Sequence, residues 1–479
     1  MARNARLWLI WIVATAAACI VLVAGMIYGG APRAHLLIGK TTSGHHQIEL
    51  SCESCHTKAF AGPESIQAAC LGCHQEELKQ AKDSHPAKKF TDPRNADRLE
   101  KLAATRCITC HTEHKPEITR AMGVTLPSDY CALCHQDIGK DRPSHKSLSF
   151  ATCADAGCHN YHDNRALYED FLEKHANEPE IAAMPIVRLK AEPPVTPRDS
   201  QPIVEASRAD HPASLAIDES ISSDWLATSH AKAGVNCSGC HAPAAKTAGE
   251  IAVAWTEKPD HTACSSCHAA EASTFTEGRH GMRLAKDMKS ERAGLFGITS
   301  DKPLTPMRPE LSRLPMSAAS HGKSLTCNTC HSAHRFDVSK AETAACLGCH
   351  DEQHSRSYRG SPHHKLHEKE LAGAAPKGSG VTCATCHLPR ETREDPETYE
   401  ERLLVSHNQN ANLRPNEKMI RSVCMNCHGL GFSIDSLADP ALVRSNFTGR
   451  PSARVESIQW VMKRLKDREG RPATSQANE

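Results

Sequence analysis

The sequence predicts a mainly α-helical chain with extensive irregular loops, little or no β-sheet and an N-terminal transmembrane helix. Three observations predict this fold class. Aromatic residues make up only 4% of the 479 residues and the mean hydropathy is −0.48, which is a poor supply of apolar side chains for a core of this size. Cysteine is abundant, at 23 residues, and nearly all of it stands in short local motifs. A long uncharged run lies at the N-terminus.

The N-terminal run, residues 7–28, is apolar over 22 residues, which is long enough to cross a hydrocarbon core of about 30 Å as a helix. Arg3 and Arg6 precede it, so the positive-inside rule keeps the N-terminus in the cytoplasm and sends the rest across the inner membrane. A cleaved signal peptide is the alternative, but its apolar core is usually shorter, and here Pro32 immediately follows the small residues Gly29 to Ala31. We therefore expect an uncleaved anchor, residues 1–40 with its flank, in which Cys19 is an inert apolar residue.

The other 22 cysteines belong to one repeated motif. Ten copies read Cys-x-x-Cys-His, and an eleventh, stretched copy reads Cys-x4-Cys-His. The cysteine pairs are Cys52 with Cys55, Cys70 with Cys73, Cys107 with Cys110, Cys131 with Cys134, Cys153 with Cys158, Cys237 with Cys240, Cys264 with Cys267, Cys327 with Cys330, Cys346 with Cys349, Cys383 with Cys386 and Cys424 with Cys427. The histidines directly after them are His56, His74, His111, His135, His159, His241, His268, His331, His350, His387 and His428. Zinc ribbons and disulfide frameworks also pair cysteines, but neither explains a histidine in every copy.

This pattern is the signature of covalent c-type haem attachment. Two thioether bonds hold the porphyrin edge, and the adjoining histidine becomes the proximal axial ligand of the iron. We therefore expect eleven covalently bound haem c groups, whose macrocycles supply the apolar bulk that the sequence lacks. Without haem, the exported part is not expected to fold stably, because burial on folding follows apolar content.

The motifs fall into two groups. Residues 41–175 are predicted to form a pentahaem domain and residues 223–440 a hexahaem domain, separated by the Pro-rich segment 176–222, which is expected to be an extended linker or a surface strap. The stretch Ala68 to His74 recurs verbatim from Ala344 to His350, which suggests duplicated haem-binding units. The net charge is +1 without long blocks of one sign, so neither nucleic acid nor an anionic membrane surface is an expected partner.

Nineteen histidines remain after the proximal set, enough to supply a second axial ligand to every iron without methionine. Bis-histidine ligation is therefore expected at most sites, and it favours low reduction potentials. The distal candidates are His46, His85, His114, His145, His162, His230, His280, His321, His334, His354 and His407.

Three of these candidates stand in His-x-x-His pairs, namely His114, His162 and His334. If the segment is helical, both histidines project from one face. The ligands of one iron approach from opposite faces of the porphyrin, so the second histidine is expected to bind a neighbouring haem.

Through these motifs the exported part resembles the bacterial multihaem c-type cytochromes. The stretched motif at Cys153 is similar to the variant in small low-potential tetrahaem cytochromes, and an N-terminal anchor before a periplasmic haem domain resembles membrane-anchored quinol dehydrogenases. The second group, with its Gly278 to Gly281 and Ser406 to Asn408 segments, loosely resembles the nitrite reductase and hydroxylamine oxidoreductase superfamily. It departs from that superfamily because no Cys-x-x-Cys-Lys motif is present and no tyrosine follows His428.

Two functions fit these features. In the first, the chain is a respiratory electron carrier between a quinol dehydrogenase or other membrane oxidoreductase donor and a periplasmic or outer-membrane acceptor. In the second, it is a reductase of a small nitrogen or sulfur oxyanion with one open iron in the second group. The residues that would serve this site are Arg356, Tyr358, Arg359, His363, His364 and His367. The alternative is that this segment is a polar surface loop with a pair of distal ligands, His354 and one of His363 or His364, and we prefer that interpretation.

The C-terminal region, residues 441–479, is expected to carry an amphipathic helix from Ser452 to Arg468. Val455, Ile458, Met462 and Leu465 fall on one helical stripe within it. The stripe is expected to pack on the haem domain, with a homodimer contact as the alternative.

Overall fold

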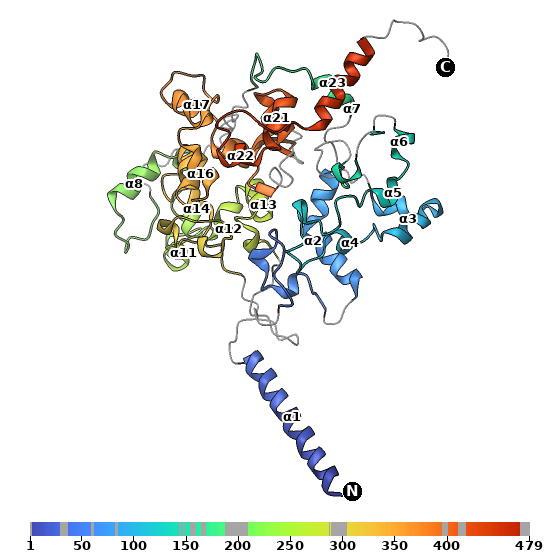
Figure 1. The fold of residues 1–479 in the computed structure, drawn as a ribbon. Coiled ribbons are helices and arrows are strands. Elements are labelled where there is room, and N and C mark those ends of the chain that lie inside the picture. The colour runs from blue at the N-terminus through green and yellow to red at the C-terminus, as the bar shows by residue number, and fades with distance from the viewer. Residues whose placement is uncertain are drawn as a thin grey trace. The chain divides into compact units, whose positions relative to one another are not determined.

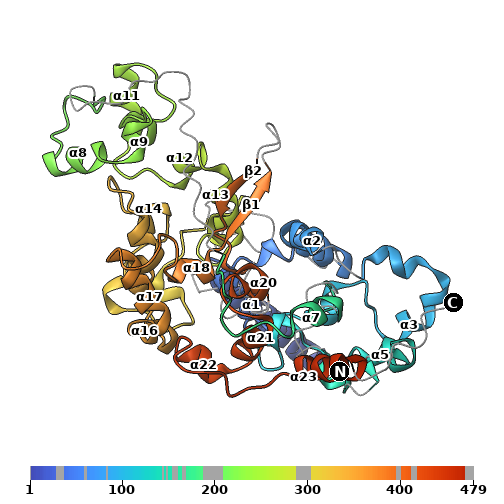
Figure 2. The same ribbon diagram turned by 90° about the horizontal axis from the view of Figure 1, so that it is seen from above.

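The computed structural model describes residues 2–28, 37–58, 62–81, 85–142, 145–146, 149–153, 160–163, 169–186, 209–286, 288, 304–394, 401–410 and 418–469. Short helices joined by long irregular segments make up nearly all of this part of the chain, with one two-stranded sheet (Figures 1 and 2). The predicted fold class is therefore confirmed. Few of the described helices exceed ten residues, and one that does, α2 (Pro63–Gln80), runs through the cysteine motif at Cys70.

Helix α1 (Ala2–Tyr28) is the longest element. Its stretch Asn4–Leu22 has a mean hydropathy of 2.1 and none of it is buried against the rest of the chain. Length and composition of this kind suit a membrane span or a signal sequence alike.

The chain divides into two compact units. The first comprises residues 1–73, 106–126 and 286–305, and the second comprises residues 74–105, 127–285 and 306–479. Besides α1, the first unit holds α4 (Cys107–Cys110) and most of α2 (Pro63–Gln80), which crosses its boundary.

The second unit contains the remaining helices. In chain order they are α3 (Ala96–Lys101), α5 (Ala132–His135), α6 (Ile138–Asp141), α7 (Glu169–His175), α8 (Glu219–Leu226), α9 (Ser229–Lys232), α10 (Ser238–His241), α11 (Ala248–Ala254), α12 (His261–Ser265), α13 (Ala269–Glu277), α14 (Cys327–His331), α15 (Ala345–Leu347), α16 (Gln353–Tyr358), α17 (Pro362–Leu371), α18 (Cys383–His387), α20 (Met419–Ser422), α21 (Leu430–Leu437), α22 (Pro440–Arg444) and α23 (Glu456–Glu469).

The cysteine motif itself folds as a single helical turn. In seven of the described copies the backbone N–H of the histidine donates to the carbonyl of the first cysteine, at 2.8–3.0 Å. Thr326 and Thr382 strengthen the turn at two sites, where each forms a capping box with the threonine three residues on. The turn places both thiols and the histidine of a motif close together.

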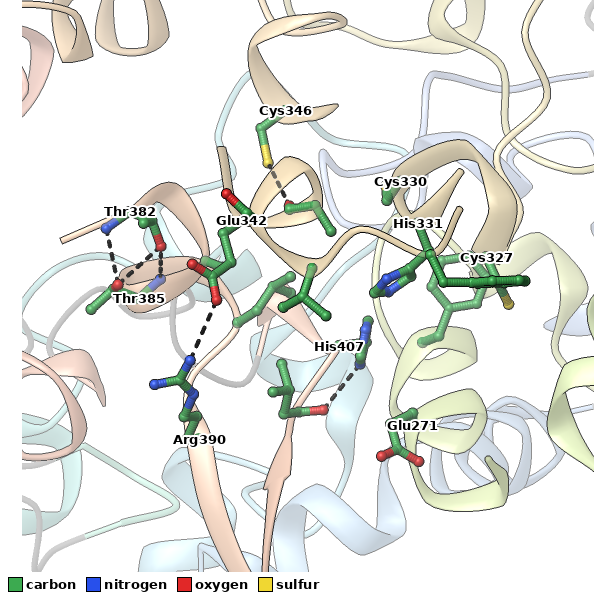
Figure 3. A pocket seen from close by; sticks show the side chains of 18 of the residues that line it. Glu271, Cys327, Cys330, His331, Glu342, Cys346, Thr382, Thr385, Arg390 and His407 are labelled. Atoms are coloured by element: carbon green, nitrogen blue, oxygen red, sulfur yellow. Dashed lines mark hydrogen bonds and ion pairs between the residues drawn. The ribbon is translucent and has the colours of Figure 1, made fainter. Parts of the chain in front are cut away.

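The sheet is a hairpin of β1 (Arg390–Glu394) and β2 (Glu401–Val405), paired antiparallel with Arg390 opposite Val405. Arg390 also forms an ion pair of 3.4 Å with Glu342, shown in Figure 3. Strand β2 ends two residues before His407, so the hairpin fixes where the His407 ring lies.

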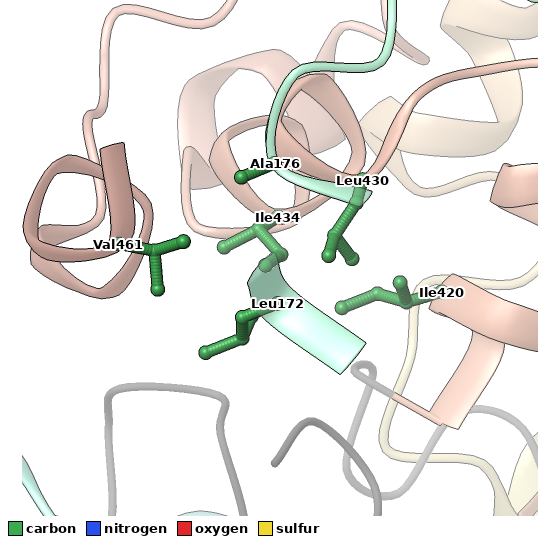
Figure 4. Packing of buried hydrophobic residues seen from close by; sticks show 6 residues of the cluster. All are labelled: Leu172, Ala176, Ile420, Leu430, Ile434 and Val461. Atoms are coloured by element: carbon green, nitrogen blue, oxygen red, sulfur yellow. The ribbon is translucent and has the colours of Figure 1, made fainter. Parts of the chain in front are cut away.

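A small apolar core stabilises the C-terminal end of the second unit. Leu172, Ala176, Ile420, Leu430, Ile434 and Val461 form its buried cluster (Figure 4). Helix α23 packs on it through the predicted stripe, whose four residues all contact the cluster. The helix begins at Glu456 rather than at Ser452, because Ser452 bonds to Asp439 instead, through its N–H at 2.8 Å and its hydroxyl at 2.7 Å.

Residues 178–186 run along the last cysteine motif. The N–H of Ala182 donates to Cys427 O at 2.9 Å, and the N–H of Gly429 donates to Pro179 O at 3.1 Å. Gly429 is required there, because a Cβ would stand 2.5 Å from Pro179 O. This part of the Pro-rich segment is therefore held against the motif by its backbone.

Candidate haem sites

Histidine rings meet in pairs throughout the described part of the chain. In each of eight pairs, one ring belongs to a cysteine motif and the other comes from a different segment. The pairs are His56 with His114, His85 with His135, His230 with His268, His241 with His334, His280 with His350, His331 with His407, His354 with His387 and His363 with His428, with ring centroids 5.9–6.5 Å apart. Figure 3 shows one of them, the rings of His331 and His407.

This spacing fits one metal ion between two imidazoles. A metal–nitrogen bond of about 2 Å on each side, added to the radius of each ring, puts two trans imidazole centroids roughly 6 Å apart. Rings in van der Waals stacking would lie closer, as Trp255 does on His241 at 4.5 Å. The eight separations therefore match axial ligation and exceed that of the stacked rings of Trp255 and His241.

The hydrogen bonds of the rings leave one nitrogen for a metal. His114 donates from Nδ1 to Gly39 O at 2.8 Å, His85 to Tyr161 O at 2.6 Å and His241 to Thr256 O at 2.6 Å. His428 and His354 make the same kind of bond, to Glu180 O at 3.0 Å and to Val443 O at 2.5 Å. A proton fixed on Nδ1 leaves the lone pair on Nε2, as in metal-bound histidines. At His354 the nitrogen left by this bond, Nε2, lies 3.3 Å from Asn446 Nδ2.

Burial keeps several of these imidazoles neutral. Burial, and after it the facing histidine, lowers the pKa of His280, His363 and His387 to about 4. A neutral imidazole is the form that binds a metal. At neutral pH these rings are therefore in the ligating state.

Aromatic side chains flank several of the paired rings. Tyr161 stacks on His85 at 4.2 Å and Phe432 on His428 at 5.0 Å. Phe336 lies 4.5 Å from His230, and Phe447 lies 5.9 Å from His363. These contacts restrict the rotation of the imidazoles.

The second unit encloses a cavity of about 3170 Å³. This volume is roughly three times the upper end of the range for one small-molecule site, about 300–1,000 Å³. Its lining includes cysteines from all six motifs between Cys237 and His428 and the motif histidines of four of them, together with apolar residues such as Leu403 and Leu442. A cavity of this size, lined by six motifs, fits several haem groups.

The thiols show that consecutive motifs lie side by side in this unit. Cys264 hydrogen-bonds to Cys327, and Cys346 hydrogen-bonds to Cys383; each contact raises the pKa of one partner, Cys327 or Cys346. Burial, and after it a thiol of the next motif, raises the pKa of Cys330 to about 12 and that of Cys386 to about 11; the neighbouring thiols are Cys346 and Cys427.

The motifs at Cys237 and Cys264 are also neighbours, through an electrostatic interaction between their thiols: burial, and after it Cys264 and Cys267, raises the pKa of Cys240. The six motifs thus follow one another in sequence order, with closer and looser neighbours in alternation. In the first unit the motifs at Cys52, Cys70 and Cys107 are also neighbours, because Cys73 contributes to the raised pKa of Cys55 and Cys107 to that of Cys70.

The second cysteines of two motifs, Cys134 and Cys349, also lie close to polar groups of the backbone. The thiol of Cys134 lies 3.9 Å from Arg98 O, a backbone carbonyl rather than another thiol. Cys349 adds to the raised pKa of Cys330, and its carbonyl accepts a hydrogen bond of 2.8 Å from the N–H of Ser317. No disulfide joins Cys134, Cys349 or the other described motif cysteines, so the disulfide alternative finds no support among them. Covalent attachment of haem to these two cysteines, as to the rest, stays a prediction.

In two of the three His-x-x-His segments the second histidine lies beside another motif: His114 faces His56, and His334 faces His241. Binding of these histidines to a neighbouring haem stays a prediction. The geometric premise was wrong, however. Helix α4 ends at Cys110 and α14 at His331, and both His114 and His334 adopt left-handed backbone angles, φ 63° and 64°. The turn out of the helix, rather than a shared helical face, sends the second ring to its neighbour.

The structure distinguishes among the predicted distal histidines. His363, which was assigned to the alternative catalytic set, faces His428, whereas His321 is exposed just after a 3-10 turn (Ala318–Ser320). His46 donates from Nδ1 to Ser43 O at 3.0 Å, and the backbone N–H of His162 donates to Asn160 Oδ1 at 2.9 Å. For these two and for His145 distal ligation stays a prediction. Cys158 and His159 of the stretched motif lie outside the described residues.

Several residues of the segment considered for oxyanion binding make other contacts. His354 and His363 each face a motif histidine, and the Tyr358 hydroxyl donates to Val381 O at 2.8 Å. Arg356 pairs with Asp351 at 3.5 Å, and Arg359 is exposed. This geometry favours the distal-ligand interpretation of the segment.

The comparison with protein families agrees with these sites. Residues 44–136, which include the first four motifs, match the family model for cytochrome c3. No curated protein and no solved structure matches the chain. The family match supports a multihaem c-type cytochrome with covalently bound haem c.

Proposed function

We propose that this chain is a membrane-anchored electron carrier with eleven covalently bound c haems, most of them held by two histidines. The observation that carries the proposal is the pairing in residues 223–440, where all six motif histidines face a second histidine ring. Two strong ligands close an iron to substrate and leave electron transfer as its chemistry.

A bound haem supplies a one-electron iron couple, and the chain's residues would hold and tune it. The motif thiols would attach the porphyrin edge, the paired imidazoles would hold the iron, and carbonyl partners of Nδ1 would fix several of the rings, among them His114, His241 and His428. The continuous order of motifs from Cys237 to Cys424 supports a conduit along this unit. The quinol or dehydrogenase donor, the periplasmic or outer-membrane acceptor and the inner-membrane location are part of the proposal, as α1 fits an anchor.

The test combines haem quantification with electron paramagnetic resonance of the oxidised protein. The expected result is eleven haems per chain and low-spin ferric signals from the six irons of the second group, unchanged by nitrite, hydroxylamine or sulfite. A high-spin signal that shifts on adding one of these ligands, and that is lost when a ligand of the second group is replaced, would contradict the proposal and favour the reductase.

A further inference from the structure

His367 is a buried histidine that axial ligation leaves unused. It lies on α17, one helical turn after His363, and only 9% of its surface is exposed. Its Nδ1 is buried and makes no hydrogen bond within the described part of the chain. A buried donor without a partner costs roughly 1–3 kcal/mol, so a group absent from the polypeptide is expected to satisfy it.

Neither an iron nor the nearest acidic side chain fills this role. Each of the six motif histidines in residues 223–440 already faces another ring, and none of those rings is His367. Glu370, on the same helix, has both oxygens occupied by backbone N–H groups, those of Gly378 and Gly380, each at 2.5 Å. Gly380 in turn leaves space beside the ring, because a Cβ there would stand 3.0 Å from Nδ1 of His367.

The remaining neighbour is the cavity. His363, His367 and His428 all line it, and positions 363 and 367 share one face of α17 because they are four residues apart. A haem held between His363 and His428 would thus have His367 beside its macrocycle. The strong hydrogen-bond acceptors of a haem are its two propionate carboxylates, and a buried carboxylate needs a donor as much as His367 needs an acceptor.

We propose that His367 anchors a propionate of the haem held by His428 and His363, by donating a hydrogen bond from Nδ1. The inference rests on the proposed haem ligation at this site. A donor at the propionate reduces its negative field at the iron and so raises the reduction potential of this last haem in the run. His367 is a positioning residue, since it acts on the iron through the haem substituent.

Holo-protein with carboxyl-13C-labelled haem propionates provides the test, by redox-difference infrared spectroscopy and potentiometric titration at a pH where the propionates are ionised. A His363→Met background separates the target haem, because methionine ligation raises its potential above the others. In that background, His367→Phe should shift a labelled carboxylate band and move the separated wave to lower potential. His367→Asn, which keeps a donor near the Nδ1 position, should restore both toward the parent. His364→Phe, a change on the same helix at a ring near Glu368, should move neither.

An unchanged labelled band and an unmoved wave in His367→Phe, with full haem content, would overturn the inference and leave the proposed ligation intact. Equal shifts in His367→Phe and His364→Phe would also overturn it, because a general disturbance of α17 would then account for both. If His363→Met displaces no wave, the ligation itself is wrong and the anchoring role falls with it.

Discussion

Gly278 offers the sharpest test of how the backbone positions a distal histidine. It follows α13, two residues before His280, and its φ of −86° suits any residue. There is nevertheless no room for a side chain at this position, because a Cβ would stand 2.7 Å from His407 O, 2.8 Å from Gln409 Oε1 and 3.1 Å from the Cα of Asn408. The amide side chain can rotate away, whereas the carbonyl of His407 belongs to the backbone.

The Gly278→Ala variant must therefore displace the peptide of His407. Restoring an ordinary contact of about 3.4 Å requires a movement of roughly 0.7 Å. The N–H of His407 donates to Thr274 Oγ1 at 3.0 Å and its Nδ1 donates to Val405 O at 3.0 Å, so these bonds resist the shift. Overpacking of this kind costs about 1–3 kcal/mol, and the ring opposite His331 is expected to lose its alignment.

The assay is electron paramagnetic resonance of the oxidised holo-protein together with its thermal melt. Gly278→Ala should alter one low-spin signal and lower the stability, whereas Gly249→Ala should do neither, since nothing lies within 4 Å of a Cβ at Gly249. If Gly278→Ala has the melting temperature and the resonance spectrum of the parent protein, the proposed link between the Gly278 contact and the position of His407 is refuted.

Replacing Cys153 and Cys158 by serine should reduce the intact mass by one haem, and an unchanged mass would show that the stretched motif carries none. Val461→Ala removes two buried methyl groups at a fully buried position and should destabilise the holo-protein by about 2 kcal/mol in denaturant titrations, whereas Val253→Ala, at an 89% exposed side chain, should not. Hydrogen bonds from Ser452 and from the first turn of α22 hold the pKa of Asp439 well below its usual range. The stabilisation is thus present above pH 4 and is lost as the pH falls, and Asp439→Asn should remove this acid dependence from the circular dichroism titration.

The fold class and the C-terminal helix were predictable because they depend on local composition and period. The low aromatic content indicated that side chains alone build little core, and the buried cluster around Ile434 is indeed small. The helical stripe was recognised, but its most buried member, Val461, was not included. Val461 lies three residues after Ile458 and four before Leu465, so helical spacing alone would have placed it on the stripe.

The proximal side of each site was readable because one rigid cofactor dictates the spacing of thiols and histidine. The distal side was not, because its ligands come from distant segments. His85 and His135 are 50 residues apart in the sequence and His280 and His350 are 70 apart, and no local pattern separates His363 from the exposed His321. Burial and a facing motif histidine distinguish His363 from His321, and both are properties of the folded chain.

Two of the His-x-x-His segments show how the backbone, rather than a helical face, directs the second histidine. A helical face would have kept both histidine rings on one side of the motif. They would then bind different haems only because the two ligands of one iron approach from opposite faces of the porphyrin. The chain instead leaves the helix at the first histidine, and the left-handed conformation of His114 and His334 directs the second ring toward another motif. Because non-glycine residues adopt this conformation at a cost, its occurrence at the same position in both segments indicates that the link between neighbouring motifs, rather than helix formation, determines the backbone there.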